Sequence, residues 1–128
     1  MKTKQLLLLL ILSLFLGACS ISSVSGYSKI TPQKAKEMLD NDPSILLIDV
    51  RTQSEYDEGH ITNAILIPNE TIGNVQPIQL PDKKAIILVY CRSGNRSKQA
   101  ADKLVKMGYQ HVYDFGGITS WPYEITKK

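Results

Sequence analysis

The sequence predicts an α/β domain built on a parallel sheet, and three features of its 128 residues lead to that prediction. Short apolar runs without alternation recur along the chain, which is typical of strands buried on both faces of a sheet. Helical patterns lie between these runs, so each strand is expected to connect to the next through a crossover. The length suits one domain of ordinary size. We therefore expect a single folded domain at residues 27–128.

The first 18 residues are interpreted as a signal peptide of the lipoprotein type. Lys2 and Lys4 precede an apolar run at residues 6–16, which is about half of the roughly 20 residues that a permanent bilayer span requires. The run ends in Leu16-Gly17-Ala18-Cys19, which resembles the lipobox of bacterial lipoproteins. An ordinary signal peptide with a chance cysteine is the alternative.

Lipidation of Cys19 would place the protein outside the cytoplasm. We expect an acylated (palmitoylated) Cys19 to hold the domain at the outer or periplasmic face of a bacterial membrane. Residues 20–26 contain four serines and one glycine. With Cys19 they form a flexible tether, residues 19–26.

Charge and cysteine count exclude several classes of protein. The net charge is +3, and Lys2 and Lys4 account for two of these charges, so a nucleic-acid partner is not expected. With Cys19 used by lipid, Cys91 is the only thiol left. That number excludes an internal disulfide, a CxxC redox pair and a multi-cysteine zinc site. We expect no metal, no cofactor and a monomer.

The first half of the domain is predicted from caps and helix-breaking residues. Thr31 caps a helix that begins at Pro32 and ends near Asn41. The run at residues 45–50 is a strand buried on both faces.

A short helix and a second strand follow. Thr52 and Glu55 form a capping box for the helix, which Gly59 closes. Residues 64–67 form the second strand. The proline-rich residues 68–82 allow a helical turn at 70–75.

The second half is predicted to hold the centre of the sheet. Residues 85–90 form the most continuous apolar run of the domain and are predicted to be its central strand, which leads directly into Cys91. A helix is expected from about residue 95 to 107, stopped by Gly108. Residues 112–113 are expected to form a last short strand.

The chemistry is expected in the loop after the central strand, because ligands of such sheets bind beyond the carboxyl ends of the strands. A tight loop before a helix turns several backbone N–H groups inward, and the helix dipole adds positive charge. This cradle favours a thiolate or an oxyanion, and its two arginines strengthen it, so Cys91 should be nucleophilic. A buried, inert cysteine is the alternative. The loop is Cys91-Arg92-Ser93-Gly94-Asn95-Arg96-Ser97.

Other polar and aromatic residues have structural interpretations. Asp49 and Arg51 follow the first buried strand and are expected to form an ion pair that supports the rim. His60 is interpreted as structural and His111 as solvated. A turn at Gly116-Gly117 and a core or rim contact for Trp121 are expected.

Over most of residues 29–125 the chain resembles the rhodanese-like sulfurtransferases. The resemblance implies a five-stranded parallel sheet flanked by helices on both faces, with a loop cysteine that accepts a sulfane sulfur as a persulfide. Cys91 matches that cysteine, and residues 92–97 match the loop that binds the substrate. The matching segments are Asp49-Val50-Arg51, Tyr56, Gly59-His60-Ile61, Asn63-Ala64, Ile67-Pro68, Val89 to Ser97, Gly108-Tyr109, Val112, Gly116-Gly117-Ile118 and Trp121.

The resemblance and the loop chemistry imply a ping-pong sulfur transfer. The Cys91 thiolate attacks the outer sulfur of a donor such as thiosulfate, sulfite leaves, and a second substrate removes the sulfur. Without a resolving cysteine, the acceptor must be external: cyanide, a small thiol or a cysteine of a partner protein.

Two other functions compete with sulfur transfer. A phosphatase or arsenate reductase places an arginine six positions after its cysteine, whereas Ser97 is found there and Arg96 lies five positions after Cys91. A non-catalytic binding module of the same fold is the second alternative, and the presence of Cys91 argues against it.

Overall fold

The computed structural model describes residues 26–128. The signal peptide at residues 1–18, the lipidation site Cys19 and the tether up to residue 25 lie outside the described residues. Among residues 26–128, no helix has both the length and the apolar character that crossing a bilayer requires.

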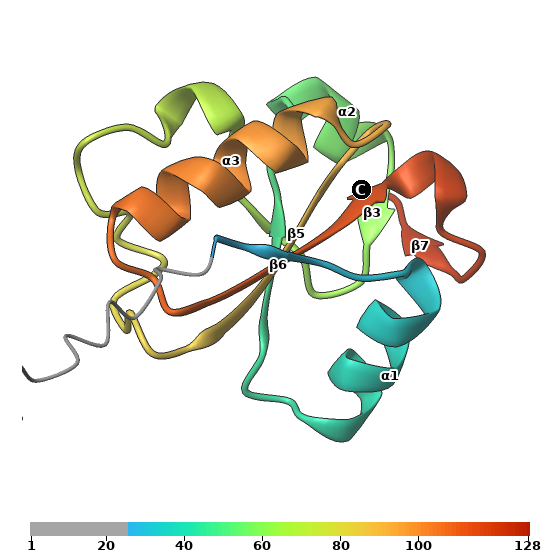
Figure 1. The fold of residues 1–128 in the computed structure, drawn as a ribbon. Coiled ribbons are helices and arrows are strands. Elements are labelled where there is room, and N and C mark those ends of the chain that lie inside the picture. The colour runs from blue at the N-terminus through green and yellow to red at the C-terminus, as the bar shows by residue number, and fades with distance from the viewer. Residues whose placement is uncertain (1–25) are drawn as a thin grey trace, which may run out of the picture.

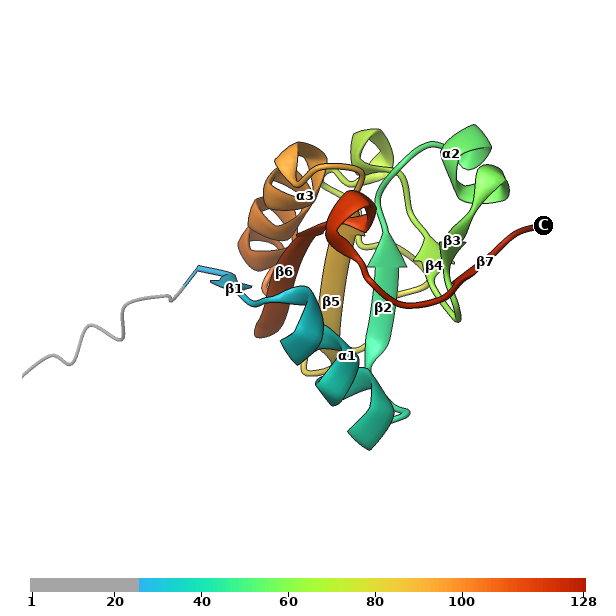
Figure 2. The ribbon, with the colours of Figure 1, turned by 90° about the vertical axis from the view of Figure 1, so that its right-hand side faces the viewer.

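The core of the domain is a five-stranded parallel sheet, as predicted. Its strand order is β1-β6-β5-β2-β4, and Figure 2 shows these strands side by side. The predicted central strand is confirmed, because β5 lies in the middle. The strands are β1 (Ser28–Lys29), β2 (Leu46–Asp49), β4 (Ile65–Leu66), β5 (Ile86–Cys91) and β6 (His111–Gly117).

Helices cover both faces of the sheet (Figure 1). Helix α1 (Pro32–Asn41) covers one face, and α3 (Asn95–Lys106) covers the other. The short helix α2 (Gln53–Glu58) lies beside the beginning of α3. The predicted N-caps are confirmed: Thr31 Oγ1 accepts the Lys34 amide at 3.0 Å, and the capping box of Thr52 and Glu55 is complete.

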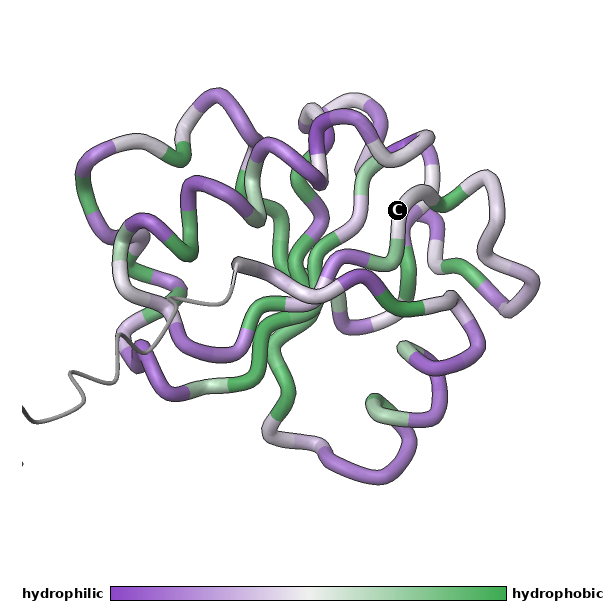
Figure 3. Tube along the Cα trace, in the orientation of Figure 1, coloured by the Kyte–Doolittle hydropathy of each residue, from purple (hydrophilic) through white to green (hydrophobic). Residues whose placement is uncertain are grey.

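The side chains of β5 divide between two apolar cores, one on each face. Ile87, Val89 and Cys91 belong to the core under α3. Leu88 and Tyr90 belong to the core under α1. Because both faces are covered, β5 is apolar along its whole length, and Figure 3 shows the hydrophobic strands at the centre of the molecule.

Several elements differ from the sequence-based expectations. β6 runs from His111 to Gly117 and is longer than the strand expected at 112–113. The helical turn expected at 70–75 is a 3₁₀ turn, η1, at Asn69–Thr71. Two strands of two residues each, β3 (His60–Ile61) and β7 (Ile125–Thr126), pair antiparallel in a separate small sheet. Pairs this short show no periodicity, because they form only once the fold brings the two segments together.

Candidate active site

Cys91 ends the central strand, and its sulfur lies under the loop that follows. The residue is 1% exposed. Its sulfur Sγ accepts a hydrogen bond from the backbone N–H of Gly94 at 3.0 Å. The pairing of β5 with β6 shifts register between Val89 and Cys91, so that Cys91 lies opposite Gly117. The thiol is therefore held in place by the strand on one side and by the loop on the other.

The loop reaches helix α3 through a left-handed residue. Gly94 has φ 109° and is the N-cap of the helix. The amides of Asn95, Arg96 and Ser97 open the helix, and none of them donates to another group among residues 26–128. Amides in the first turn of a helix lack intrahelical acceptors and favour anions. The loop thus combines one N–H directed at the sulfur with a helix N-terminus whose first backbone N–H groups have no acceptor among residues 26–128.

Ser97 supports the loop from below and does not extend toward its open side. Its side chain is fully buried. The hydroxyl is within hydrogen-bond distance of the carbonyls of Gly94, at 3.1 Å, and Gly116, at 3.3 Å. Arg92, Ser93 and Asn95 are exposed. The seven-residue loop therefore has exposed side chains at its mouth and a buried hydroxyl at its base.

The end of β6 fixes the outer part of the loop. A side chain at Gly117 would place its Cβ 2.0 Å from the carbonyl oxygen of Arg92, so only glycine fits there. Thr119 donates to the same carbonyl through its amide, at 3.2 Å, and its hydroxyl, at 3.0 Å. The sequence indicated only a turn at Gly116-Gly117. Its role as the support of the loop depends on a contact between segments 25 residues apart.

Glu55 is the site residue that sequence analysis missed. Its position in the capping box already accounted for a glutamate there, so no contact with the loop was expected. Its carboxylate accepts two hydrogen bonds from the guanidinium of Arg96, at 2.7 and 2.8 Å. It also accepts the amide and hydroxyl of Thr52, both at 3.0 Å. The bonds from Arg96 lower the pKa of Glu55 from 4.5 to about 2, with a smaller contribution from Thr52.

This pair distinguishes the two arginines that were expected to strengthen the cradle. Arg96 is bound at both of its terminal nitrogens to Glu55, so its charge is largely neutralised locally. Arg92 is exposed and has no ion pair among residues 26–128. Arg92 is therefore the unpaired cation of the loop.

Asp49 and Arg51 form the expected ion pair, and it is buried. Arg51 Nη2 lies 2.7 Å from Asp49 Oδ2, and the same nitrogen donates to the Gly59 carbonyl at 2.7 Å. The hydroxyl of Tyr90 donates to Asp49 at 2.7 Å and accepts the amide of Ile61 at 3.0 Å. Burial, reinforced by the Asp49 carboxylate, raises the pKa of Tyr90 far above its usual value. Tyr90 faces the α1 side of the sheet and Cys91 the α3 side, so this network supports the rim from the other face.

His60 and Trp121 have structural environments, and His111 is solvated, as expected. The ring of His60 stacks on Tyr56 with centroids 3.6 Å apart, and its Nδ1 lies 2.8 Å from the Tyr56 carbonyl. His111 is exposed. Trp121 packs against Phe115 with ring centroids 5.5 Å apart. Among residues 26–128, no three His, Cys, Asp or Glu side chains come together as metal ligands would.

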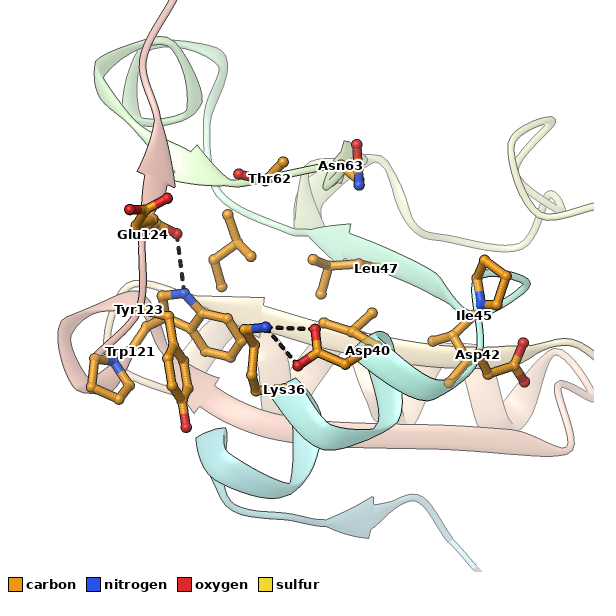
Figure 4. Close-up of a pocket in the computed structure, with 14 residues that line it drawn as sticks. Lys36, Asp40, Asp42, Ile45, Leu47, Thr62, Asn63, Trp121, Tyr123 and Glu124 are labelled. Carbon is orange, nitrogen blue, oxygen red and sulfur yellow. Dashed lines mark hydrogen bonds and ion pairs between the residues drawn. The ribbon is translucent and has the colours of Figure 1, made fainter.

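A cavity of about 780 Å³ lies apart from the sulfur, between α1, β2 and the C-terminal segment. Figure 4 shows Lys36 bound to Asp40 and the indole nitrogen of Trp121 directed at the carbonyl of Glu124. None of its lining residues belongs to the loop at 91–97. The cavity contributes no residue to the cysteine site.

Comparison with known proteins agrees with this geometry. Residues 31–123 match the model of the rhodanese-like domain. The thiosulfate sulfurtransferase GlpE of Tolumonas auensis is 34% identical over 108 residues, which cover 80% of this chain and 99% of that protein. The adenylyltransferase and sulfurtransferase UBA4 of Candida albicans is 32% identical over 89% of this chain, which spans only 28% of that longer protein.

A solved structure shows the same fold. The rhodanese-like domain protein of Staphylococcus aureus superposes with a TM-score of 0.69 at 31% identity, covering 79% of this chain and 98% of that one. The family model matches well over half of the chain, and GlpE, which the match covers almost completely, is a sulfurtransferase by name. The chain belongs to the rhodanese-like family.

Proposed function

We propose that this protein is a sulfurtransferase that carries a sulfane sulfur on Cys91. The observation that supports it most directly is the hydrogen bond from the Gly94 amide to Cys91 Sγ, at the unpaired N-terminus of α3. Such a donor stabilises a sulfur anion, and the neighbouring amides are placed to receive a second sulfur or the oxygens of a small oxyanion. The names of the related sulfurtransferases point to the same chemistry.

The transfer occurs in two nucleophilic displacements, and neither requires a cofactor. The Cys91 thiolate attacks the outer sulfur of thiosulfate or a similar donor, a new S–S bond forms, and sulfite leaves with the electron pair of the broken bond. A thiophilic acceptor then attacks the terminal sulfur of the persulfide. That step releases Cys91 as a thiolate, ready for the next cycle.

The acceptor comes from outside the chain. Cys91 is the only cysteine at residues 26–128, so no second thiol of the domain resolves the persulfide. Cyanide, a small thiol or a cysteine of a partner protein can serve. The side chains at the mouth of the loop are exposed, so such a nucleophile would approach from solvent.

The location proposed for this activity is the outer surface of a bacterial membrane. The lipobox-like Leu16-Gly17-Ala18-Cys19 supports an acyl anchor on Cys19. Full-length protein is expected to fractionate with membranes, and Cys19→Ser is expected to release it. A Cys19→Ser variant that stays in the membrane fraction contradicts the anchor.

Intact-mass spectrometry tests the persulfide directly. Incubation with thiosulfate should add one sulfur atom, and Cys91→Ser should abolish both this adduct and thiocyanate formation with cyanide. Cys19→Ser, the same substitution at the other cysteine, should retain both. An adduct that survives in Cys91→Ser refutes the proposal. Turnover of an aryl phosphate well above background would favour the phosphatase alternative.

A further inference from the structure

A surface with both basic and apolar side chains lies at the edge of the sheet opposite to Cys91. We call it the basal edge and define it as residues 73–84 and 102–111. Residues 73–84 lead into the first residue of β5, and Cys91 is the last residue of that strand. Residues 107–110 connect α3 to the first residue of β6, which is parallel to β5. Figure 1 shows the loop before β5 and the end of α3 at the same side of the molecule.

Two large apolar side chains project from this edge. Ile78 is 93% exposed and Val75 is 80% exposed, which makes them the most exposed large hydrophobic side chains among the described residues. They are held on a folded loop. Gln76 donates to the carbonyls of Leu80 and Pro81, at 2.9 and 3.1 Å.

Leu80 anchors that loop to the body of the domain. Its side chain is fully buried, and its carbonyl accepts the hydroxyl of Tyr109 at 2.6 Å. Its amide donates to Pro77 at 3.0 Å. Val75 and Ile78 therefore project from a loop that is fixed to the domain. Apolar side chains held exposed in this way are typical of a surface that binds an apolar partner.

Lysines lie on the same edge as the apolar pair. A groove of about 500 Å³ beside the loop is lined by Lys83, Lys103 and Lys106, and Lys84 is exposed next to it. The acidic groups of the basal edge are Asp82 and Asp102, so the lysines are in excess. Lys83 donates to the Met107 carbonyl and Lys103 to Asn69, whereas the Lys84 ammonium has no hydrogen bond or ion pair among residues 26–128 and Lys106 has only the 3.9 Å contact with Asp102. Lysines around exposed aliphatic side chains are typical of surfaces that bind anionic lipid.

The start of the described chain lies near the same edge. Tyr27 is half-buried and packs against the core under α3. β1 runs parallel to β6 with Ser28 opposite Tyr113, so Tyr27 lies beside the first residues of β6, at the basal edge. Asp102 is within 3.9 Å of Lys106. Eight residues, 19–26, reach at most about 28 Å, so an anchor at Cys19 would keep the basal edge near the lipid surface.

We propose that the basal edge docks on an anionic lipid bilayer and leaves the Cys91 loop facing the aqueous phase. Ile78 and Val75 enter the headgroup region, and Lys84 and Lys106 contact the anionic headgroups. The orientation rests on the anchor proposed above, whereas the docking surface is a property of the folded domain alone. Sulfur acceptors then reach Cys91 from the side away from the membrane.

Vesicle sedimentation with residues 26–128 tests the surface without the anchor. GlpE, which this domain spans almost completely, shows that a relative exists as this domain alone. At millimolar lipid, the domain should bind vesicles of phosphatidylcholine that contain about one third phosphatidylglycerol. High salt should release it from these vesicles, and it should not bind vesicles of phosphatidylcholine alone.

Paired substitutions locate the binding surface. Lys84→Gln with Lys106→Gln should lower the partition coefficient by about twentyfold, and Val75→Ser with Ile78→Ser by about tenfold. Lys127→Gln with Lys128→Gln makes the same change of charge far from the edge and should alter it by less than about twofold. Thermal unfolding shows whether each variant is folded.

The outcomes separate this proposal from the proposed activity. Equal binding by all the variants, or no binding to anionic vesicles at low salt, refutes docking even if Cys91 takes up sulfur. Binding that depends on the basal edge supports docking even if no adduct forms. Binding that requires an added protein in place of lipid would identify a protein partner for the surface and overturn the proposal.

Discussion

The two faces of the sheet each carry an arginine–carboxylate pair near the rim, and the pairs differ in burial. On the α1 face, Arg51 and Asp49 lie 2.7 Å apart with side chains 6% and 0% exposed. On the α3 face, Arg96 and Glu55 also lie 2.7 Å apart, with side chains 27% and 23% exposed. Similar contact distances therefore occur in a dry and in a partly wet environment.

Because the two pairs differ in burial, we expect them to have different roles. Tyr90 and the Gly59 carbonyl complete the hydrogen bonds of the buried pair, so it is closed to any ligand. The pair on the α3 face joins α2 to the loop that holds Cys91, and solvent and small ions can reach it. We expect the buried pair of Arg51 and Asp49 to contribute mainly to the stability of the fold. The pair of Arg96 and Glu55 is expected to set the charge near Cys91.

The largest expected effect comes from breaking the buried pair. Arg51→Ala leaves the Asp49 carboxylate buried without its cation and should lower the free energy of unfolding by about 3–5 kcal/mol. Arg96→Ala removes a partly exposed cation and should cost about 1 kcal/mol. Denaturant unfolding measures both. Equal losses in the two variants would mean that burial does not distinguish the pairs.

A steric test addresses the loop on the α3 face. Gly117→Ala pushes a methyl group into the carbonyl of Arg92, so the loop must move away from its place above the sulfur. A displacement of about 1 Å at a reacting group costs about a hundredfold in rate, and the rate of sulfur uptake from thiosulfate should fall by that factor. Gly73→Ala, which meets nothing within 4 Å, is the control. Normal uptake in Gly117→Ala would show that the loop position is not critical.

The next effect distinguishes the two arginines of the loop. Thiosulfate is a dianion, and a hydrogen bond to a charged group contributes about 1.5–3 kcal/mol. Arg92→Gln should therefore lower kcat/KM for the donor by about tenfold to a hundredfold and flatten its salt dependence. Arg96→Gln should lower it by less than about tenfold, because Glu55 already occupies that guanidinium. The reverse order would show that Arg96 leaves Glu55 when the donor binds.

Sequence patterns predicted the parts of this fold that depend on neighbours in the chain. The cap at Thr31, the capping box at Thr52 and the apolar run of β5 are local signals, and the structure has all three. The pairing of β3 with β7 and the contact of Gly117 with Arg92 join distant segments, and no local pattern encodes them.

The candidate site divides in the same way. The loop from Cys91 to Ser97 was identified from its place between a strand and a helix. Glu55 was missed as a partner of Arg96, because its capping role already accounted for its presence. Where one residue has both a local role and a contact with a distant segment, the sequence pattern reveals only the local role.

The smallest expected effect isolates the charge of Glu55. Its pKa is lowered to about 2 in the folded protein, against 4.5 for the free side chain, so its ionised form stabilises the fold. That contribution is complete above pH 4.5 and is lost as the pH falls from about 4.5 toward 2. Solvent screening limits it to about 1 kcal/mol. Unfolding free energies measured across this range should fall with acid in the unmodified protein and less steeply in Glu55→Gln.

The same variant connects stability to the site. Glu55→Gln keeps the side-chain oxygen that can cap Thr52 but removes the charge that neutralises Arg96. The positive potential near Cys91 should then rise, and sulfur uptake from thiosulfate should become about twofold to fivefold faster at low ionic strength, with no gain at high salt. Glu58→Gln, the same change at an exposed position of α2, serves as the control and should leave the salt dependence unchanged. Slower uptake in Glu55→Gln at every ionic strength would mean that the carboxylate acts by holding the loop in place. The pair on the α3 face would then be as structural as the buried pair.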